Sequence, residues 1–385
     1  MPGDFYYIIN PGILSRKRLL AYPLLATKFY VPTLRPGVIS RPRLLERFGT
    51  SLRHKLILVS APAGFGKTTA INEWIAGLSG SVAWLSLDMG DNDPIRFWTY
   101  LIAALQTVQP GLGESAQEML HNPQPLPLEA ILTALINEIA SSPKTLVLVL
   151  DDYHQIEAQA VHDGLIFLLE NQPQNFHLVV AGRSDPPWPL ARLRGRQEVA
   201  EFREQDLRFD AEETTAFLNR SMHLDLSEVD ILALKEHTEG WIAGLQMAAL
   251  SLRGQDDAHR FVTSFTASNR FIFDYLIEEV LRKQSAEVQD FLLKTSILDQ
   301  LCGPLCDAVL ERANSQQVLE YLDRAHLFLT PLDDQRNWYR YHHLFADLLR
   351  GQLEKNLPEH ADLHRRACGW LEARGFSANA LGHAL

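Results

Sequence analysis

The chain has 385 residues, of which 46% are hydrophobic and 22% charged, and its formal net charge is −11. This length exceeds one ordinary core, so we expect roughly two to four domains. An acidic chain is not built to hold nucleic acid along its whole length, although Arg192, Arg194 and Arg196 could form a local basic patch. No apolar run reaches the ~18 residues of a membrane span, so we expect a cytoplasmic protein without a membrane partner.

The three cysteines, Cys302, Cys306 and Cys368, cannot form a closed disulfide framework, which favours a reducing compartment. Cys302 and Cys306 are four residues apart, but no second Cys or His pair completes a zinc pattern. We therefore expect them to be small buried hydrophobic residues.

The two ends of the chain differ from its middle. Residues 11–26 are basic and then apolar, but Pro23 interrupts the short apolar part, so we expect residues 1–26 to form a loose extension. A misassigned start codon is the alternative. The final helical pattern stops at Leu385 without a capping residue, so we expect the natural chain to continue.

Short apolar runs punctuate the first 200 residues and are rich in Val, Ile and Leu. They are Leu56–Val59, Val82–Leu87, Leu146–Leu150 and Leu178–Ala181. Nearly continuous runs of this length are typical of strands buried on both faces, as in a parallel sheet. Helical patterns lie between them, at 70–78 and 97–108. The alternation predicts an α/β domain with a parallel sheet.

From about residue 206 the pattern becomes helical. The predicted helices are Ala211–Arg220, Glu228–His237, Ile242–Leu252, Asn269–Lys283 and Ala286–Thr295. Asp210, followed three residues later by Glu213, predicts a helix start. Two strand-like runs, Leu327–Leu332 and Trp338–His342, flank a polar tip and predict a hairpin, which after helices indicates a winged-helix unit. Residues 361–385 resemble the first helical pair of a repeat.

Residues 61–69 (APAGFGKTT) follow a predicted strand and open a predicted helix. They match the P-loop pattern G-x-x-x-x-G-K-[ST], with Ala61 in place of the first glycine. Small residues let backbone N–H groups surround phosphate oxygens, and the helix N-terminus adds partial positive charge. Lys67 can reach the β- and γ-phosphates, and Thr68 can bind Mg²⁺. The loop predicts binding of ATP or ADP with Mg²⁺.

A carboxylate for Mg²⁺ is predicted at Asp151, which ends the apolar run 145–150 at the carboxyl edge of the sheet. Asp152 is then placed to orient or deprotonate the attacking water. The alternative is that both acids cap the following helix.

Arg183 follows another predicted strand, and an arginine there can stabilise the γ-phosphate. The alternative is a surface arginine after a strand. Lys67, Asp151, Asp152 and Arg183 are thus the expected catalytic residues.

Together these motifs resemble the STAND class of P-loop ATPases, and within it the MalT-like, LuxR-type bacterial transcriptional activators. The resemblance covers roughly residues 24–385 and rests on short segments in a fixed order. They are 26–32 (ATKFYVP), 38–44 (VISRPRL), 61–69, 148–154 (LVLDDYH), 183–187 (RSDPP), 206–209 (DLRF), 239–246 (EGWIAGLQ) and 341–345 (YHHLF).

The resemblance implies a domain order. After the extension 1–26 come a nucleotide-binding domain at 27–205, a helical domain at 206–268, a winged-helix domain at 269–352 and, at 353–385, an arm and the start of a helical-repeat sensor. In the family, a helix-turn-helix that binds DNA follows the sensor. It is absent from this chain.

The resemblance also implies a switch. ADP holds a closed monomer, ATP and an unknown small-molecule or protein inducer open it into a self-associating form, and slow hydrolysis resets it. Such a switch requires nucleotide to bind the two states with different affinity. The implied nucleotide-binding residues are Val38, Ile39, Arg41, Pro62, Ala63, Gly64, Phe65, Gly66, Lys67, Thr68, Thr69, Arg183 and His342.

Some implied roles leave alternatives. His342 corresponds to the family's phosphate-sensing histidine, with His343 as second candidate and a partly buried structural histidine as the alternative. Ile242 stands where the family often has a proline near adenine. Two other functions remain open: a STAND scaffold with an effector that does not bind DNA, and a P-loop small-molecule kinase, which would need an acceptor pocket and an arginine-bearing lid.

Overall fold

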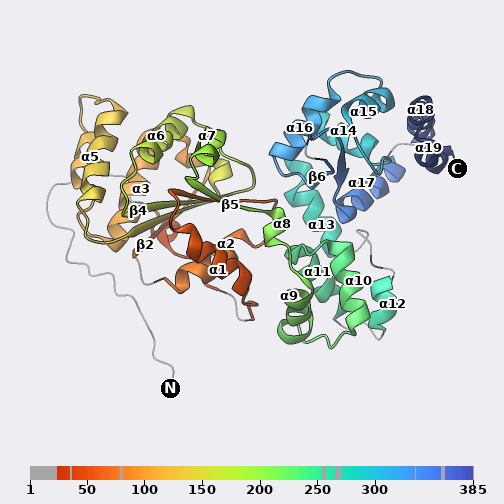
Figure 1. The fold of residues 1–385 in the computed structure, drawn as a ribbon, viewed down its shortest axis with the longest axis horizontal. Coiled ribbons are helices and arrows are strands. Elements are labelled where there is room, and N and C mark those ends of the chain that lie inside the picture. Colours follow the sequence, from red (N-terminus) through yellow and green to blue (C-terminus); the bar gives the residue numbers. More distant parts are fainter. Residues whose placement is uncertain are drawn as a thin grey trace.

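The computed structural model describes residues 24–34, 37–78, 81–253, 257–263, 265, 270–333, 335–356 and 360–384. The sheet lies toward one end of an elongated molecule, and the C-terminal helices lie furthest from it (Figure 1). The predicted extension lies outside the described residues apart from 24–26. Leu25 donates its backbone N–H to the hydroxyl of Tyr100 (3.0 Å), so the chain enters the fold against a helix of the α/β part.

Parallel strands form the main sheet in the order β2-β3-β4-β1-β5. They are β1 (Leu56–Ser60), β2 (Ser81–Ser86), β3 (Leu146–Asp151), β4 (Phe176–Gly182) and β5 (Val199–Arg203). The predicted parallel sheet is confirmed, and the first four strands coincide with the predicted apolar runs. The sequence patterns missed β5 because it is a half-buried edge strand that includes Glu201 and Arg203.

Side chains alternate across the sheet and bury against helices on both faces. Ile57 and Val59 join one core with α1 (Pro42–Ser51) and α2 (Lys67–Ala76). Leu56 and Leu58 join the opposite core. The helices of that second core are α3 (Pro94–Val108), α4 (Glu114–Leu120), α5 (Leu128–Ala140), α6 (Gln159–Glu170) and α7 (Leu190–Gly195). Burial on both faces explains the nearly continuous apolar runs.

The next part is helical, as predicted. Its helices are α8 (Glu204–Leu207), α9 (Ala211–Thr215), α10 (Glu228–Thr238), α11 (Ile242–Leu252) and α12 (Ala258–Thr263). The predicted helix start is confirmed by two hydrogen bonds. The Asp210 side chain accepts from the backbone N–H of Glu213 (2.8 Å), and the Glu213 side chain accepts from the backbone N–H of Asp210 (3.2 Å). A π-helical segment, Ala216–Ser221, follows α9 where a continuous α-helix was expected.

The winged-helix part contains the predicted hairpin. Its helices are α13 (Arg270–Glu279), α14 (Ala286–Thr295), α15 (Gly303–Leu310), α16 (Ser315–Arg324) and α17 (His343–Asn356). The strands β6 (Leu329–Pro331) and β7 (Tyr339–Tyr341) pair antiparallel before α17. The helices α18 (His360–Ala373) and α19 (Ser377–Ala384) then pack against each other, as the helical pair predicted for residues 361–385.

Short 3₁₀ helices connect several of these elements. They are η2 (Ala26–Phe29), η3 (Met89–Asn92), η4 (Tyr153–Gln155) and η6 (Leu281–Lys283). Cys302 and Cys306 are buried free thiols, as expected. Within the described ranges, no group of three His, Cys, Asp or Glu side chains could hold a metal, and no helix combines the length and apolarity that a membrane span requires.

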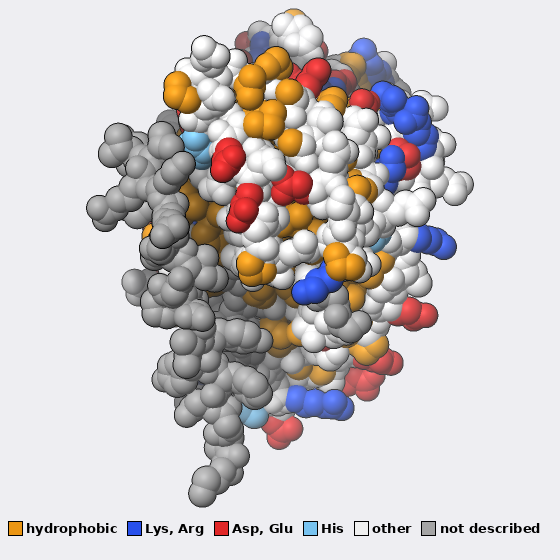
Figure 2. Space-filling view, turned by 90° about the vertical axis from the view of Figure 1, so that its left-hand side faces the viewer, with side chains coloured by type: hydrophobic (Ala, Val, Ile, Leu, Met, Phe, Trp, Pro, Cys, Tyr) orange, Lys and Arg blue, Asp and Glu red, His pale blue; other side chains and the backbone are white. Residues whose placement is uncertain are grey.

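The suggested basic patch is largely neutralised. Arg192 pairs with Glu170 (2.7 Å) and Arg194 with Glu201 (2.7 Å). On the face at the sheet-bearing end, hydrophobic, acidic and basic side chains are interspersed (Figure 2). The described residues of this face therefore offer no continuous basic stripe of the kind that follows a nucleic-acid backbone.

Candidate nucleotide-binding site

The loop between β1 and α2 has the backbone that phosphate binding requires. Gly64 (φ +77°) and Gly66 (φ +75°) both adopt the left-handed conformation that favours glycine. A Cβ at Gly64 would also lie only 2.6 Å from the Cβ of Ala243, so glycine is needed there for space as well. Gly66 immediately precedes α2, so the free N–H groups of the helix start face the loop.

Lys67 is buried within its own loop. Its Nζ donates to the backbone carbonyls of Ala61 (2.8 Å) and Pro62 (2.9 Å). Burial, followed by the charge of nearby Arg183, lowers the pKa of Lys67 to about 8. The ammonium is therefore held by neutral carbonyl oxygens, and a phosphate would supply the counter-charge that favours its charged form.

Thr68 and Asp151 meet across the sheet edge, although β4 separates β1 from β3. The Thr68 hydroxyl donates to Asp151 Oδ2 (2.9 Å), and Asp151 Oδ1 accepts from the backbone N–H of Asp152 (3.0 Å). Burial, then the neighbouring Asp152, raises the pKa of Asp151 to about 6. A hydroxyl and a carboxylate side by side match the oxygen ligands of Mg²⁺, which would neutralise phosphate charge when bound.

The Asp152 carboxylate points outward. Its side chain is about half exposed (54%), and it makes no capping bond to η4 although it occupies the N-cap position. The alternative in which both acids merely cap the next helix is therefore not what the geometry shows. Asp152 adopts φ +58°, a left-handed conformation, directly after β3 ends at Asp151.

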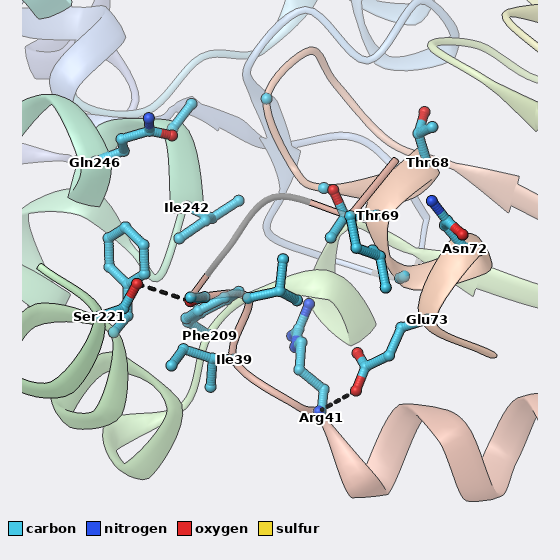
Figure 3. A pocket seen from close by; sticks show the side chains of 18 of the residues that line it. Ile39, Arg41, Thr68, Thr69, Asn72, Glu73, Phe209, Ser221, Ile242 and Gln246 are labelled. Atoms are coloured by element: carbon cyan, nitrogen blue, oxygen red, sulfur yellow. Dashed lines mark hydrogen bonds between the residues drawn. The ribbon is translucent and has the colours of Figure 1, made fainter. Parts of the chain in front are cut away.

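A cavity of about 670 Å³ opens beside the loop, within the size range of small-molecule sites. Residues 32–34, 37–39 and 41, the start of α2, Phe209 and the helical part all contribute to its walls (Figure 3). The expected nucleotide-binding residues Val38, Ile39 and Arg41 line it, as do Gly64, Gly66, Thr68 and Thr69. The cavity is also lined by residues that were not predicted, which include Asn72, Glu73, Phe209, Phe217, Met222, Gln246 and Tyr275.

Arg41 lines the cavity and is held there by contacts with three neighbouring residues. Its guanidinium lies 4.5 Å from the centre of the Phe209 ring and pairs with Glu213 (3.1 Å). Its backbone N–H donates to Glu73 of α2 (3.3 Å), the dashed contact in Figure 3. Ser221 donates to the carbonyl of Gly37 (2.7 Å), which ties the segment to the helical part.

The start of α11 bonds directly to the P-loop. Trp241 Nε1 donates to the carbonyl of Ala63 (3.0 Å), and the backbone N–H of Ala243 donates to the carbonyl of Gly64 (3.2 Å). Ile242, the residue that departs from the family pattern, lines the cavity between them. The helical part thus contacts the P-loop directly.

Arg183 reaches α13. Its Nη2 lies 3.1 Å from Glu279 Oε2, and its Nη1 donates to the Glu279 carbonyl (3.4 Å). Tyr275, one turn earlier on α13, faces the loop, since a Cβ at Gly64 would lie 2.9 Å from its hydroxyl. Burial raises the pKa of Tyr275 to about 12, so its hydroxyl stays a donor. The contacts that α13 makes with Arg183 and the P-loop were not predicted, because the sequence pattern there indicated a helix but no site residue.

His342 does not line the cavity. It is fully buried, its Nε2 lies 3.0 Å from the Thr238 carbonyl oxygen, and its Nδ1 has no partner within the described residues. The ring of Trp241, which contacts the P-loop, packs against it at 6.0 Å. Burial lowers the pKa of His342 to about 4. His343 is exposed and lies near Glu239 (4.0 Å) instead.

Comparisons with known proteins agree with this architecture. Residues 277–361 match the MalT winged helix domain. The whole arrangement is similar to a Walker-type ATPase of Pyrococcus abyssi, with a TM-score of 0.55, 16% identity and coverage of 81% of this chain and 96% of that one. The chain therefore has the fold of P-loop ATPases, with an attached winged helix.

Within this class, curated relatives are more similar in sequence. The transcriptional regulator MalT of Klebsiella pneumoniae is 36% identical over 368 residues, and so is the serine/threonine-protein kinase PknK of Mycobacterium tuberculosis. The match covers 94% of this chain but 40% of MalT and 33% of PknK. Sequence and fold together are similar to those of the MalT-like P-loop ATPases, which confirms the resemblance.

Proposed function

We propose that this chain is the ATP- and ADP-binding switch module of a LuxR-type, MalT-like transcriptional regulator that acts in the cytoplasm. ADP holds the closed form, ATP together with an unidentified inducer opens it into a self-associating form, and slow hydrolysis resets it. DNA would be bound by a domain outside this chain. The proposal extends what is known of similar proteins to a chain that spans 40% or less of their length.

The observation that carries the proposal is the bonding of α11 to the P-loop through Trp241 and Ala243. A helical part that touches the phosphate loop directly can respond to what the loop holds, since a nucleotide shifts the closed state only through differential contacts. The loop backbone, the Thr68–Asp151 pair and the cavity supply the binding site.

Each predicted residue has a proposed role in this site. Residues 62–69 would surround the phosphates, and Val38, Ile39 and Arg41 would face the base and ribose. Thr68 and Asp151 would hold Mg²⁺. Asp152 would orient the attacking water, and Arg183 would contact the γ-phosphate.

We assign His342 an indirect role, through its contact with Trp241 (6.0 Å between ring centres). It would support the closed form from behind the loop without contacting the phosphates. The predicted domain boundaries, 27–205, 206–268, 269–352 and 353–385, belong to the same proposal.

A scaffold with another effector is the second candidate, because a similar segment occurs in a relative named as a serine/threonine-protein kinase. The printed sequence contains neither an H-R-D nor a D-F-G tripeptide, motifs on which protein-kinase catalysis depends. A segment shared by a regulator and a kinase is best explained as a common switch joined to different effectors. The small-molecule kinase alternative has less support, since α13 of the winged-helix part bonds to Arg183, the residue proposed to contact the γ-phosphate.

The first experiment identifies the nucleotide that copurifies with the chain. Heat-released ligand is analysed by mass spectrometry, and we expect ADP at close to one equivalent. Steady-state assays should then detect slow ATP hydrolysis that needs no second substrate. Protein that binds neither ADP nor ATP in calorimetry, or that transfers phosphate stoichiometrically to a metabolite or a protein, would contradict the proposal.

A further inference from the structure

The phosphate end of the site carries an acidic residue that the proposed chemistry does not use. Glu279 ends α13, and its Oε2 accepts from both Arg183 (3.1 Å) and Lys283 (2.6 Å). Hydrogen bonding from Lys283, together with the bond from Arg183, outweighs burial and lowers the pKa of Glu279, so this carboxylate is charged at neutral pH. An anion thus lies beside the residue expected to meet the γ-phosphate.

The Arg183–Glu279 pair lies close enough to the P-loop for the charge of Arg183 to act on Lys67. The charge of Arg183 helps to lower the pKa of Lys67, after burial. Burial, then Arg183, Lys67 and Lys283, lowers the pKa of His154 to about 4. The charges of Arg183, Lys67 and Lys283 thus all act on His154, and Glu279 bonds to Arg183 and Lys283.

We infer that Glu279 makes the closed site selective for a nucleoside diphosphate, by binding Arg183 in the place of a γ-phosphate. The inference rests on the proposed nucleotide site and adds a specificity-determining residue to it. A diphosphate leaves Arg183 with Glu279 as its partner. A γ-phosphate competes for the same guanidinium and repels the carboxylate, so the Arg183–Glu279 pair must separate before Arg183 can reach a triphosphate.

The pair also links nucleotide identity to the winged-helix part. Glu279 is the last residue of α13, and α13 packs against α11, which bonds to the P-loop, and against α17. Tyr275 on the same helix faces Gly64. Separation of Glu279 from Arg183 would therefore free the C-terminal end of α13 from the α/β part, while α13 still contacts α11 and α17.

Solvent exposure of the Arg183–Glu279 pair limits how strongly Glu279 can change nucleotide affinity. The side chains of Arg183 and Glu279 are 32% and 38% exposed, so water screens their attraction and a moderate coupling is expected. We expect Glu279→Gln to lower the Kd of a non-hydrolysable ATP analogue about tenfold while the Kd of ADP changes less than twofold. The control Glu278→Gln makes the same charge change at an exposed position of α13 and should leave both values unchanged.

A double-mutant cycle tests whether Glu279 acts through Arg183. Both nucleotides are titrated by calorimetry into wild type, Glu279→Gln, Arg183→Gln and the double variant. The ratio of the two Kd values is the readout, because loss of folding would weaken both nucleotides alike. In the Arg183→Gln background, Glu279→Gln should change this ratio less than twofold.

Three possible results of these titrations decide whether Glu279 sets the nucleotide preference through Arg183. A tenfold change in the ratio that disappears without Arg183 supports the inference. An unchanged ratio in Glu279→Gln, or a change that persists in the Arg183→Gln background, overturns it while leaving the nucleotide site intact. Failure of wild-type protein to bind either nucleotide overturns the proposed function, and this inference with it.

Discussion

Trp241 of the helical part donates its indole N–H to the carbonyl oxygen of Ala63 in the P-loop, at 3.0 Å. The same indole packs against Phe328 and His342 of the winged-helix part, with ring centres 5.2 and 6.0 Å away. Trp241, a residue of the helical part, thus contacts both the P-loop of the α/β part and the winged-helix part. Because the bond ends on the phosphate loop, any movement of α11 away from the loop must break it.

Trp241→Phe removes the donor and keeps most of the ring packing. An unsatisfied buried carbonyl costs about 1–2 kcal/mol, so we expect the closed form to weaken and bound ADP to leave roughly 5- to 30-fold faster. Stopped-flow release of a fluorescent ADP analogue measures this rate. Trp370→Phe, outside the site, is the control, and an equal release rate in Trp241→Phe and wild type would contradict the role of this bond.

Lys67→Ala should abolish measurable binding of ATP and ADP. The ammonium is the cation held inside the loop, and without it the backbone N–H groups alone face the phosphate charge. Calorimetry with each nucleotide is the measurement. Lys144→Ala alters an exposed lysine far from the loop in sequence and should bind normally. Wild-type affinity in Lys67→Ala would exclude this loop as the site.

Asp152→Asn should preserve nucleotide binding and slow hydrolysis by roughly 10²- to 10⁴-fold, the usual contribution of a general base. Asparagine tolerates the left-handed backbone at this position, so the fold should be retained. Single-turnover hydrolysis of radiolabelled ATP gives the rate, and calorimetry gives the affinity. Hydrolysis at the wild-type rate would remove Asp152 from the mechanism.

Mg²⁺-dependent nucleotide affinity should fall as the pH drops from about 7 to 5. The pKa of Asp151 is about 6 in the nucleotide-free site, because burial and Asp152 disfavour its charged form. A protonated carboxyl is a poor Mg²⁺ ligand, so protons compete with the metal below pH 6. Titrations with Mg²⁺ and with EDTA separate this effect from general loss of binding. Asp151→Asn should bind weakly at every pH, and a pH profile like that of wild type in this variant would contradict the assignment.

Acidification should destabilise the fold through His342. Its pKa is about 4 when folded and near 6.5 when unfolded, so between these values the unfolded chain binds the extra proton. Stability therefore rises with pH across this window and is lost as pH falls from about 6.5 to 4, by up to about 3 kcal/mol. Urea unfolding at pH 7, 6 and 5 measures the slope.

The matched variants for this prediction are His342→Gln and His121→Gln. We expect the pH slope to decrease in His342→Gln. It should be unchanged in His121→Gln, because that residue is exposed at the end of α4. Equal slopes in wild type and His342→Gln would show that the buried imidazole is not the group responsible.

The sequence by itself determined the local features. A nearly continuous apolar run predicts a strand buried on both faces, and Gly64 and Gly66 predict a left-handed loop before a helix. Asp210 and Glu213 predict a helix start by direct bonding over three residues. Each of these depends on contacts within a few positions of the chain, so each is encoded in neighbouring residues.

Only the tertiary structure decided which distant residues meet the loop. Trp241, Tyr275 and Glu279 carry no local signal for a phosphate site, and they reach it because packing of α11 and α13 brings them there. Likewise, His342 lies behind Trp241 because burial of two aromatic rings sets its position. Such contacts depend on how helices pack over roughly a hundred or more residues of sequence, which no short pattern records.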